Sequence, residues 1–527
     1  ALSMAEMWAV PTALRRALAE AFCESAGEVI RRARERRQAE RFVDGDGRIC
    51  DASAFYERAL QLSVERELPA LRERLEGRIA RLGESGEKMI RLEHEAQALL
   101  SMRLDNLIGA KRMLDALDWR ECFRALSRAE AELCADPDGT YPRMDEASRA
   151  AVREQVSRIA RRLRLSEHSV ARQAVEAAKE QSDQARGTVC WWLYDDEGRA
   201  ALAKRLGARG GLPRLVPDPR GRGLIVAQAA LAAALFALYA LLARSLLVLA
   251  LGVPLAWCAA MLLVGRVGTR FVRPRRLLKL ELNALGDDER VLVAMPVLLS
   301  SVKRALHLCE GLETAGCLDH DENVSYLLLG DFRDGPSETE ADDAEILDAV
   351  RRRIRAMNER AGREKYFYLH RRRTFYAPDS RWMGRERKRG ALMDLNCLLL
   401  GRAGAQNAFA AEGEACAALA GRFSMVLTLD ADTRLAPGSV HALAGTLLHP
   451  VNRPRTENGV RRGYAVLQPN MELAASSCTN EFVRLFAGRG GMDAYPVTVS
   501  NLYQDLAGQG SFGGKGIYDV RAFMEAV

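Results

Sequence analysis

The sequence lacks the features that mark several common protein classes. Its 11 cysteines are scattered, with no Cys-x-x-Cys pair and no histidine at metal-ligating spacing. This argues against a disulfide framework or a zinc site and is typical of reduced thiols in a cytosolic setting. The opening residues 1–22 are amphipathic and lack a charged segment followed by an apolar core, so we expect no signal peptide. They also lack an initiator Met, and we expect the chain to be a piece of a longer protein.

The net charge is small for a protein of this size. A net charge of +7 over 527 residues suits an anionic partner or a membrane surface without requiring either. Hydrophobic residues make up 48% of the chain, which excludes general disorder. The length predicts two or three domains.

Residues 1–188 predict an all-α region, because apolar residues recur every three or four positions between arginine and glutamate. Two motifs in it are incomplete. Residues 44–55 start like a calcium loop but lack its glycine and its final glutamate. Residues 158–178 resemble a helix-turn-helix, but a solvated basic helix explains them better, and we expect no nucleic-acid partner. A connector, residues 189–222, follows.

Two uncharged runs, Leu224–Ala243 and Leu246–Gly265, predict a transmembrane helical hairpin over residues 223–267. A buried hairpin in a soluble protein is the alternative. Arginines flank the pair on both sides, which favours a multi-pass protein of a bacterial inner membrane, with the amino-terminal region and the catalytic domain facing the cytoplasm. The lipid bilayer would then be a partner.

From about residue 268 to 527 the pattern predicts an α/β domain. Short apolar runs at 290–299, 324–332, 365–373, 424–432 and 463–469 alternate with helical stretches such as 343–362 and 436–449. This alternation favours a mostly parallel sheet, whose ligands lie beyond the carboxyl ends of the strands.

The run 424–432 ends in Asp430 and Asp432. Residues i and i+2 at a strand end point to the same side, so both carboxylates would face one spot. Hard oxygen ligands suit Mg²⁺ or Mn²⁺, and such an ion would offset charge on a departing diphosphate. A plain aspartate cap between a strand and a helix is the alternative.

Other residues accompany this pair. The run 324–332 contains Asp331 at its end, and Asp334 follows. A basic cluster before a predicted helix would form an anion site; it comprises Arg385, Arg387, Lys388 and Arg389. Pro296 is expected where the first strand gives way to a loop.

This order of motifs resembles the nucleotide-sugar glycosyltransferases of the GT-A type. The segments "LDADTRLAPGSVHALAGTLLHPVNRP", "GYAVLQPNMEL" and "VSNLYQDLAGQGSFGGKGIYDVRAF" are similar to the glycosyltransferase domain of bacterial cyclic β-1,2-glucan synthases, as are the opening residues and "GTVCWWLYDDEGRAAL". The resemblance implies an inverting transfer of glucose from UDP-glucose to a growing β-glucan acceptor. It implies that Asp430 and Asp432 bind metal and nucleotide, and that Pro296, Asp331, Lys388 and Arg389 contribute to donor binding.

The segment "GQGSFGGKGIYD" contains G-x-G-x-x-G and hints at a P-loop, but no clear strand precedes it and Gly516 replaces the required Ser or Thr. The resemblance instead implies an acceptor-side role for four residues: Tyr503, Gln504, Asp505 and Lys515. The catalytic base is expected beyond residue 527, with Asp505 and Asp519 as weaker candidates. The alternatives are a related β-glucan synthase of different linkage, or a membrane-anchored interaction protein with a relic transferase domain.

Overall fold

The computed structural model describes residues 3–208, 212, 221–241, 246–271, 276–317, 319–410, 413–457, 460–469, 480–481 and 512–526. The chain divides into two compact units, residues 1–131 and 132–527.

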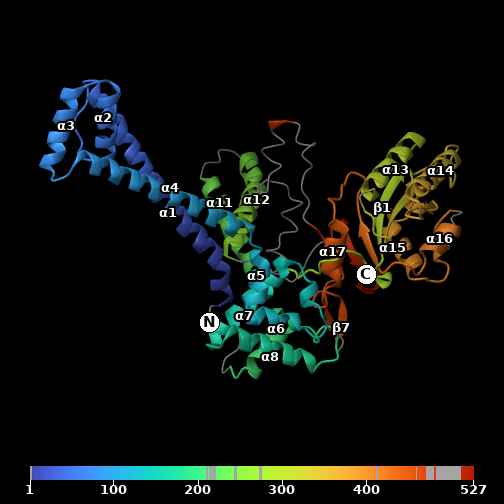
Figure 1. Ribbon diagram of the computed structural model, residues 1–527. Coiled ribbons are helices and arrows are strands. Elements are labelled where there is room, and N and C mark those ends of the chain that lie inside the picture. The colour runs from blue at the N-terminus through green and yellow to red at the C-terminus, as the bar shows by residue number, and fades with distance from the viewer. Residues whose placement is uncertain are drawn as a thin grey trace. The chain divides into compact units, whose positions relative to one another are not determined.

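The first unit is helical. Its helices are α1 (Met4–Val43), α2 (Ser53–Glu65), α3 (Pro69–Arg81), α4 (Gly86–Ala116) and α5 (Trp119–Leu126) (Figure 1). Side chains at the helix starts satisfy free backbone amides: Ser3 and Glu6 form a capping box on α1, and Ser85 caps α4. Phe55, Tyr56 and neighbouring apolar side chains of α1, α2 and α3 form its core.

The second unit begins with further helices. They are α7 (Glu146–Leu163), α8 (Glu167–Lys179), α9 (Val189–Tyr194) and α10 (Asp196–Arg205), after α6 (Arg128–Cys134), which crosses the division. All six residues of α9 are buried. Asp136 explains how this apolar helix is held, since its carboxylate accepts hydrogen bonds from the Tyr141 and Val189 amides.

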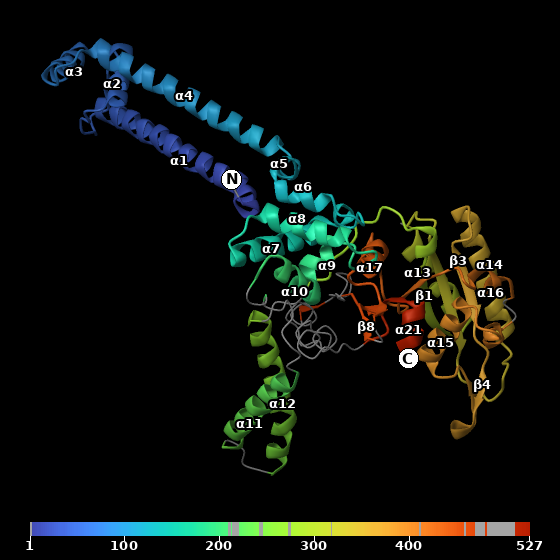
Figure 2. The ribbon, with the colours of Figure 1, turned by 90° about the horizontal axis from the view of Figure 1, so that it is seen from below.

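Helices α11 (Gly221–Ala240) and α12 (Leu246–Phe271) pack against each other (Figure 2). Gly252 permits the close approach, because a Cβ there would lie 2.2 Å from the Tyr239 ring. Across the described residues, however, no helix combines the length and apolar composition needed to cross a membrane. The helix bounds differ from the apolar runs: α11 stops at Ala240, and α12 continues through Arg266 and Arg270. The predicted transmembrane hairpin is therefore wrong, and so is the multi-pass inner-membrane localisation that rested on it.

The rest of the unit is built on a six-stranded sheet, ordered β3-β2-β1-β6-β10-β9 in the described residues. The strands are β1 (Val291–Leu299), β2 (Val324–Phe332), β3 (Tyr366–His370), β6 (Met425–Thr428), β9 (Val466–Leu467) and β10 (Gly516–Asp519). Strands β1, β2, β3 and β6 are parallel, and β10 is antiparallel to both β6 and β9. The strands predicted around residues 290–299, 324–332, 365–373, 424–432 and 463–469 are all present.

Helices cover both faces of the sheet. One face carries Ala294, Leu327 and Phe367, which pack in a core with α15 (Arg387–Leu399) and α16 (Gly413–Leu419). The alternating residues Tyr326 and Tyr366 face the other way, toward α13 (Val302–Gly316). Helix α14 (Asp343–Ala361) packs on α13 and β3.

The second unit contains further short elements. Its remaining α-helices are α17 (Ser439–Leu448) and α21 (Val520–Ala526), and its 3-10 helices are η1 (Tyr141–Arg143), η2 (Asp287–Glu289), η3 (Ala377–Asp379) and η4 (Ala405–Ala408). Two antiparallel strand pairs complete the described elements: β4 (Thr374–Tyr376) with β5 (Arg381–Met383), and β7 (Arg455–Glu457) with β8 (Val460–Arg462).

Candidate functional site

The strand order places a switch point between β1 and β6. The chain leaves β1 toward β2 and β3 on one side, and returns to pair β6 on the other side of β1. In α/β sheets, the crevice beyond the carboxyl ends of strands at such a point is where ligands bind. Thr428 pairs with Ala294 in the parallel register, so the residues after Thr428 enter this crevice.

Asp430 lies in the crevice between two lysines. Lys388, from the first turn of α15, makes a short ion pair with Asp430 Oδ1 and donates a 2.7 Å hydrogen bond to the carbonyl of Gly514. Lys515 Nζ lies 3.1 Å from Asp430 Oδ2. Helix α15, the end of β6 and the start of β10 therefore meet at this carboxylate.

Asp432 lies at the open rim of the same site. Its side chain is 86% exposed, and its Oδ1 lies 4.0 Å from Lys515 Nζ. Strand β6 has already ended at Thr428, and a turn follows in which the Thr433 amide donates to the Asp430 carbonyl. Both aspartates thus face Lys515 from a turn, although the sequence placed them on a strand end.

The charges around Asp430 favour its ionised form. Partial burial acts to raise the pKa of Asp430, but hydrogen bonds and charge from Lys388 and Lys515 outweigh it and lower this pKa below its ordinary value. The carboxylate is therefore negative at neutral pH and holds both ammonium groups at the site.

This lowered pKa gives a pH dependence with a definite sign. The ion pairs of Asp430 stabilise the fold above the ordinary carboxyl pKa of about 3.9, and this stabilisation is lost as pH falls through the lowered pKa. We expect the difference in unfolding free energy between wild type and Asp430→Asn to shrink from pH 7 to pH 3, measured by urea denaturation at both pH values. A difference that stays constant would show that Asp430 contributes no ion-pair stabilisation.

Asp331, at the end of β2, is held by a residue that the sequence analysis missed. Arg371 Nε and Nη2 lie 2.7 and 2.6 Å from the two oxygens of Asp331, and Arg371 Nη1 lies 3.1 Å from Asp394. The remaining Arg371 contacts are to the carbonyls of Arg385 and Arg387, at 2.8 and 3.0 Å. Arg371 therefore fixes the entry to α15, the helix that carries Lys388.

Burial makes this pair a rigid support. The Arg371 side chain is 2% exposed and that of Asp331 is 13% exposed. Burial acts to lower the pKa of Arg371, but the hydrogen bonds and charge of Asp331 and Asp394 raise it above its ordinary value. The only sequence signal was the basic run 371–373 directly after β3, and a basic run is usually solvated.

Other predicted residues take different positions. Strand β1 continues through Pro296 to Leu299, so the prediction that Pro296 ends the strand is wrong. Alternate residues of β1 bond toward β6, as the 3.0 Å bond from the Leu429 amide to the Ala294 carbonyl shows. Pro296 is the next residue of β1 whose backbone points toward β6, but β6 has ended at Thr428. The amide that proline lacks would therefore have no partner in that strand.

The basic cluster does not act as one patch. Arg389 pairs with Glu386 at 2.8 Å and Arg387 pairs with Asp334 at 2.6 Å, whereas Lys388 alone contacts Asp430. Lys515, predicted on the acceptor side, instead contacts the two aspartates. Three further predicted residues lie outside the described residues: Tyr503, Gln504 and Asp505.

Asp519 is also separated from the site. It pairs in register with Met425, at the beginning of β6, and its carboxylate accepts a hydrogen bond from the Ala522 amide. This places Asp519 at the opposite end of β10 from Lys515. Its position does not suit a catalytic base acting at Asp430.

Gly514 is required by two features of the site. Its φ is +79°, a conformation costly for other residues, and a Cβ there would lie 3.0 Å from Lys388 Nζ. We expect Gly514→Ala to lower the unfolding free energy by about 1–2 kcal/mol and to shift Lys388, as measured by urea denaturation. Gly311→Ala is the matched control, because nothing lies within 4 Å of its Cβ on α13 and the change should stabilise by roughly 0.5–1 kcal/mol. Equal effects of the two changes would contradict this role of Gly514.

Two ammonium groups and two carboxylates meet in this crevice. Two ammonium groups and the amino-terminal end of α15 would attract phosphate oxygens. No group of three or more His, Cys, Asp or Glu side chains suited to a metal ion occurs in the described part of the chain. Asp430 and Asp432 alone therefore offer carboxylates here, which matches the one or two that a phosphate-bound Mg²⁺ needs.

The chain is 31% identical, over 578 aligned residues, to the cyclic beta-(1,2)-glucan synthase NdvB of Rhizobium meliloti (strain 1021). The alignment includes 100% of this chain and 20% of the relative, so the chain spans about a fifth of the length of the curated protein it matches. A scan against protein-family models found no match. The similarity runs along the whole chain and supports the resemblance to this family.

Proposed function

We propose that this chain contributes glucosyltransferase activity to glucan synthesis, because similarity to a fifth of a cyclic β-1,2-glucan synthase runs along all of this chain. The donor would be UDP-glucose, the acceptor a growing β-1,2-glucan, and the transfer inverting. The structural observation that supports the proposal is the pair Lys388 and Lys515 on either side of Asp430, beside the exposed Asp432, at the switch point of the sheet. We further propose that the sheet belongs to the GT-A type.

Mg²⁺ or Mn²⁺ is the proposed cofactor, and the donor set fits it. Each Asp430 oxygen contacts one lysine ammonium group. A carboxylate has about four lone-pair positions, so Asp430 can still coordinate a metal ion. Asp432 is almost fully exposed and its carboxylate is open to a ligand. When bound, the ion would supply Lewis-acid stabilisation of charge on the diphosphate.

The residues of the chain have separate roles in this proposal. Lys388 and Lys515 would release Asp430 in part and bind diphosphate oxygens, which offsets negative charge as glucose leaves. Arg371 is a positioning residue, because it fixes Asp331 and the two carbonyls before Lys388. Inversion also needs a carboxylate that takes the acceptor hydroxyl proton, and the proposal assigns that role to no described residue.

Glucose incorporation from radiolabelled UDP-glucose, followed by linkage analysis of the product, tests this function. In membranes of cells that produce the protein, we expect incorporation that requires Mg²⁺ or Mn²⁺, stops with EDTA, and yields β-1,2 bonds. Residues 1–527 alone, to which the proposal assigns no catalytic base, should bind UDP with metal and turn over little glucose. A product with another linkage would indicate a related β-glucan synthase instead. Absence of both incorporation and metal-dependent UDP binding would overturn the proposal and favour a relic transferase domain.

A further inference from the structure

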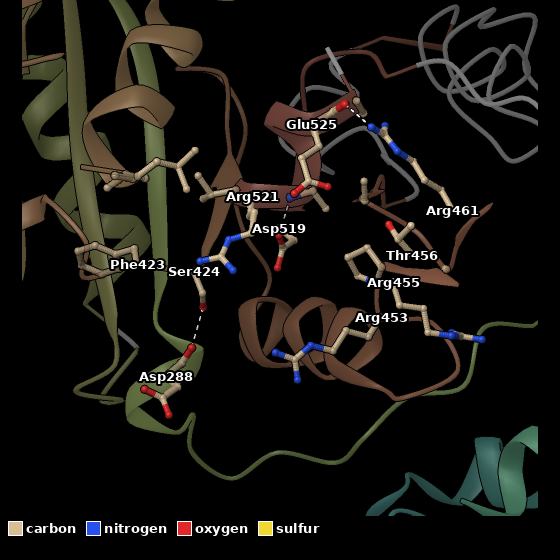
Figure 3. A pocket seen from close by; sticks show the side chains of 18 of the residues that line it. Asp288, Phe423, Ser424, Arg453, Arg455, Thr456, Arg461, Asp519, Arg521 and Glu525 are labelled. Carbon is tan, nitrogen blue, oxygen red and sulfur yellow. Dashed lines mark hydrogen bonds between the residues drawn. The ribbon is translucent and has the colours of Figure 1, made fainter. Parts of the chain in front are cut away.

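A second charged pocket lies at the amino-terminal ends of β1 and β6, whereas Asp430 follows the carboxyl end of β6. It has a volume of about 730 Å³ and is lined by residues next to the starts of β1 and β6, by the β7–β8 pair and by α21 (Figure 3). Asp519, at the far end of β10 from Lys515, is in its wall. The four residues of β10 span roughly 13 Å, which separates this pocket from the proposed donor site.

Arginine dominates the charge of this pocket. Its lining contains no lysine and six arginines: Arg422, Arg453, Arg455, Arg461, Arg462 and Arg521. They come from separate loops, strands and α21, so the fold gathers them from distant parts of the sequence. Figure 3 shows Arg453, Arg455 and Arg461 on one side of the hollow and Arg521 on the other.

Several of these guanidinium groups are not neutralised by the protein. Arg462 pairs with Glu197, and Arg461 donates to the backbone carbonyl of Glu525. By contrast, Arg453 and Arg521 form no ion pair or hydrogen bond through their side chains to any other described residue. Two cations therefore face an open hollow with their donors unused.

The acidic residues of the pocket do not cancel this charge. Four line it against six arginines: Asp287, Asp288, Asp519 and Glu525. Asp287 already pairs with Arg290 at 2.9 Å, and the Asp519 carboxylate accepts the Ala522 amide. The pocket consequently keeps a positive balance and a set of guanidinium forks, which match the oxygens of phosphate groups.

We propose that this pocket is a second anion site, which binds a ligand carrying a diphosphate group. In this proposal the two linked phosphates are shared between Arg453 and Arg521, which Figure 3 shows on different sides of the hollow. The ligand could be an inorganic diphosphate or a nucleoside diphosphate, since the recognised chemistry is the same. The proposal is independent of glucose transfer and of Asp430.

Binding of pyrophosphate and of UDP, each without metal, tests the proposal by calorimetry and by hydrogen–deuterium exchange of the intact chain. We expect protection of residues 453–456 and 519–526, and a loss of pyrophosphate affinity of at least tenfold in Arg453→Ala/Arg521→Ala. Arg352→Ala/Arg355→Ala on α14 removes the same charge from exposed positions and should leave affinity within twofold. Arg453→Lys/Arg521→Lys keeps the charge but not the forks, and should retain part of the affinity.

The outcomes separate the possibilities. Binding of both ligands with protection at these segments supports recognition of the diphosphate, and binding of UDP alone at them would assign the source to a nucleotide. Protection confined to residues 388 and 428–433 would overturn the proposal, because only the donor site would then bind. Equal losses in the two double alanine variants would also overturn it, since they would show nonspecific charge attraction. A melting curve for each variant shows whether a lost signal reflects unfolding.

Discussion

Replacement of Arg371 by methionine is expected to lower the unfolding free energy of the second unit by about 3–5 kcal/mol, the cost of breaking a buried ion pair from one side. Asp331 would remain 13% exposed without its two guanidinium hydrogen bonds. The carbonyls of Arg385 and Arg387 would also lose their donor, so the start of α15 would loosen. Urea denaturation of the purified chain measures the first effect.

Arg372→Met is the control for this change. The neighbouring Arg372 is exposed and its Nε donates a 3.0 Å hydrogen bond to the Phe409 carbonyl, without an ion pair to a carboxylate in the described residues. We expect it to cost less than about 1 kcal/mol. If the two changes cost the same, the Arg371–Asp331 pair would not be the support that the geometry indicates.

Replacement of Asp430 by asparagine is expected to weaken the binding of UDP with Mn²⁺ by at least roughly tenfold to a hundredfold, the range for losing even a group that only orients a metal ligand. Without metal, the substitution should not weaken UDP binding, because it removes a negative charge and releases Lys388 and Lys515. UDP alone should then bind the variant at least as tightly as wild type. Isothermal titration with MnCl₂ and with EDTA measures both affinities.

Asp342→Asn provides the control for charge. Asp342 precedes α14 and its side chain makes no capping hydrogen bond, so this substitution removes a carboxylate away from the crevice. We expect unchanged UDP affinity under both conditions. An equal loss for Asp430→Asn with and without metal would mean that Asp430 supports the fold and does not bind the ion.

The sequence predicted the sheet better than the site built on it. Buried runs of β-branched and aliphatic residues form strands wherever a sheet is covered on both faces, and this local signal located β1, β2, β3 and β6. The strand end at Thr428 could not be read, because the apolar pattern continues to Leu429. The turn that carries both aspartates depends on the Thr433–Asp430 bond.

The helical hairpin shows why apolar runs alone mislead. The run Leu224–Ala243 corresponds to α11, which is Gly221–Ala240, whereas α12 begins with its run at Leu246 but extends past Gly265 to Phe271. Pairwise contacts over long separations were equally hidden. Arg371 and Asp331 are 40 residues apart and Lys388 and Gly514 are 126 apart, so no local pattern joins them.

The basic cluster illustrates a different limit. Arg387, Lys388 and Arg389 are adjacent in sequence, but successive residues of a helix start point in different directions. Only Lys388 faces the crevice, while its neighbours pair with Asp334 and Glu386. The sequence composition predicted a cationic side chain at this site, but the backbone geometry of the helix start determines that it is Lys388.

The central claim is that Asp430 and Asp432 hold a divalent ion against a diphosphate bound by Lys388 and Lys515. A crystal structure of the chain with UDP and MnCl₂, with anomalous diffraction from manganese, tests it most directly. We predict a manganese peak at roughly 2.0–2.3 Å from carboxylate oxygens of Asp430 and Asp432, with diphosphate oxygens in reach of both lysines. A bound UDP without manganese at these aspartates, or an empty crevice at saturating concentrations of both, would contradict it.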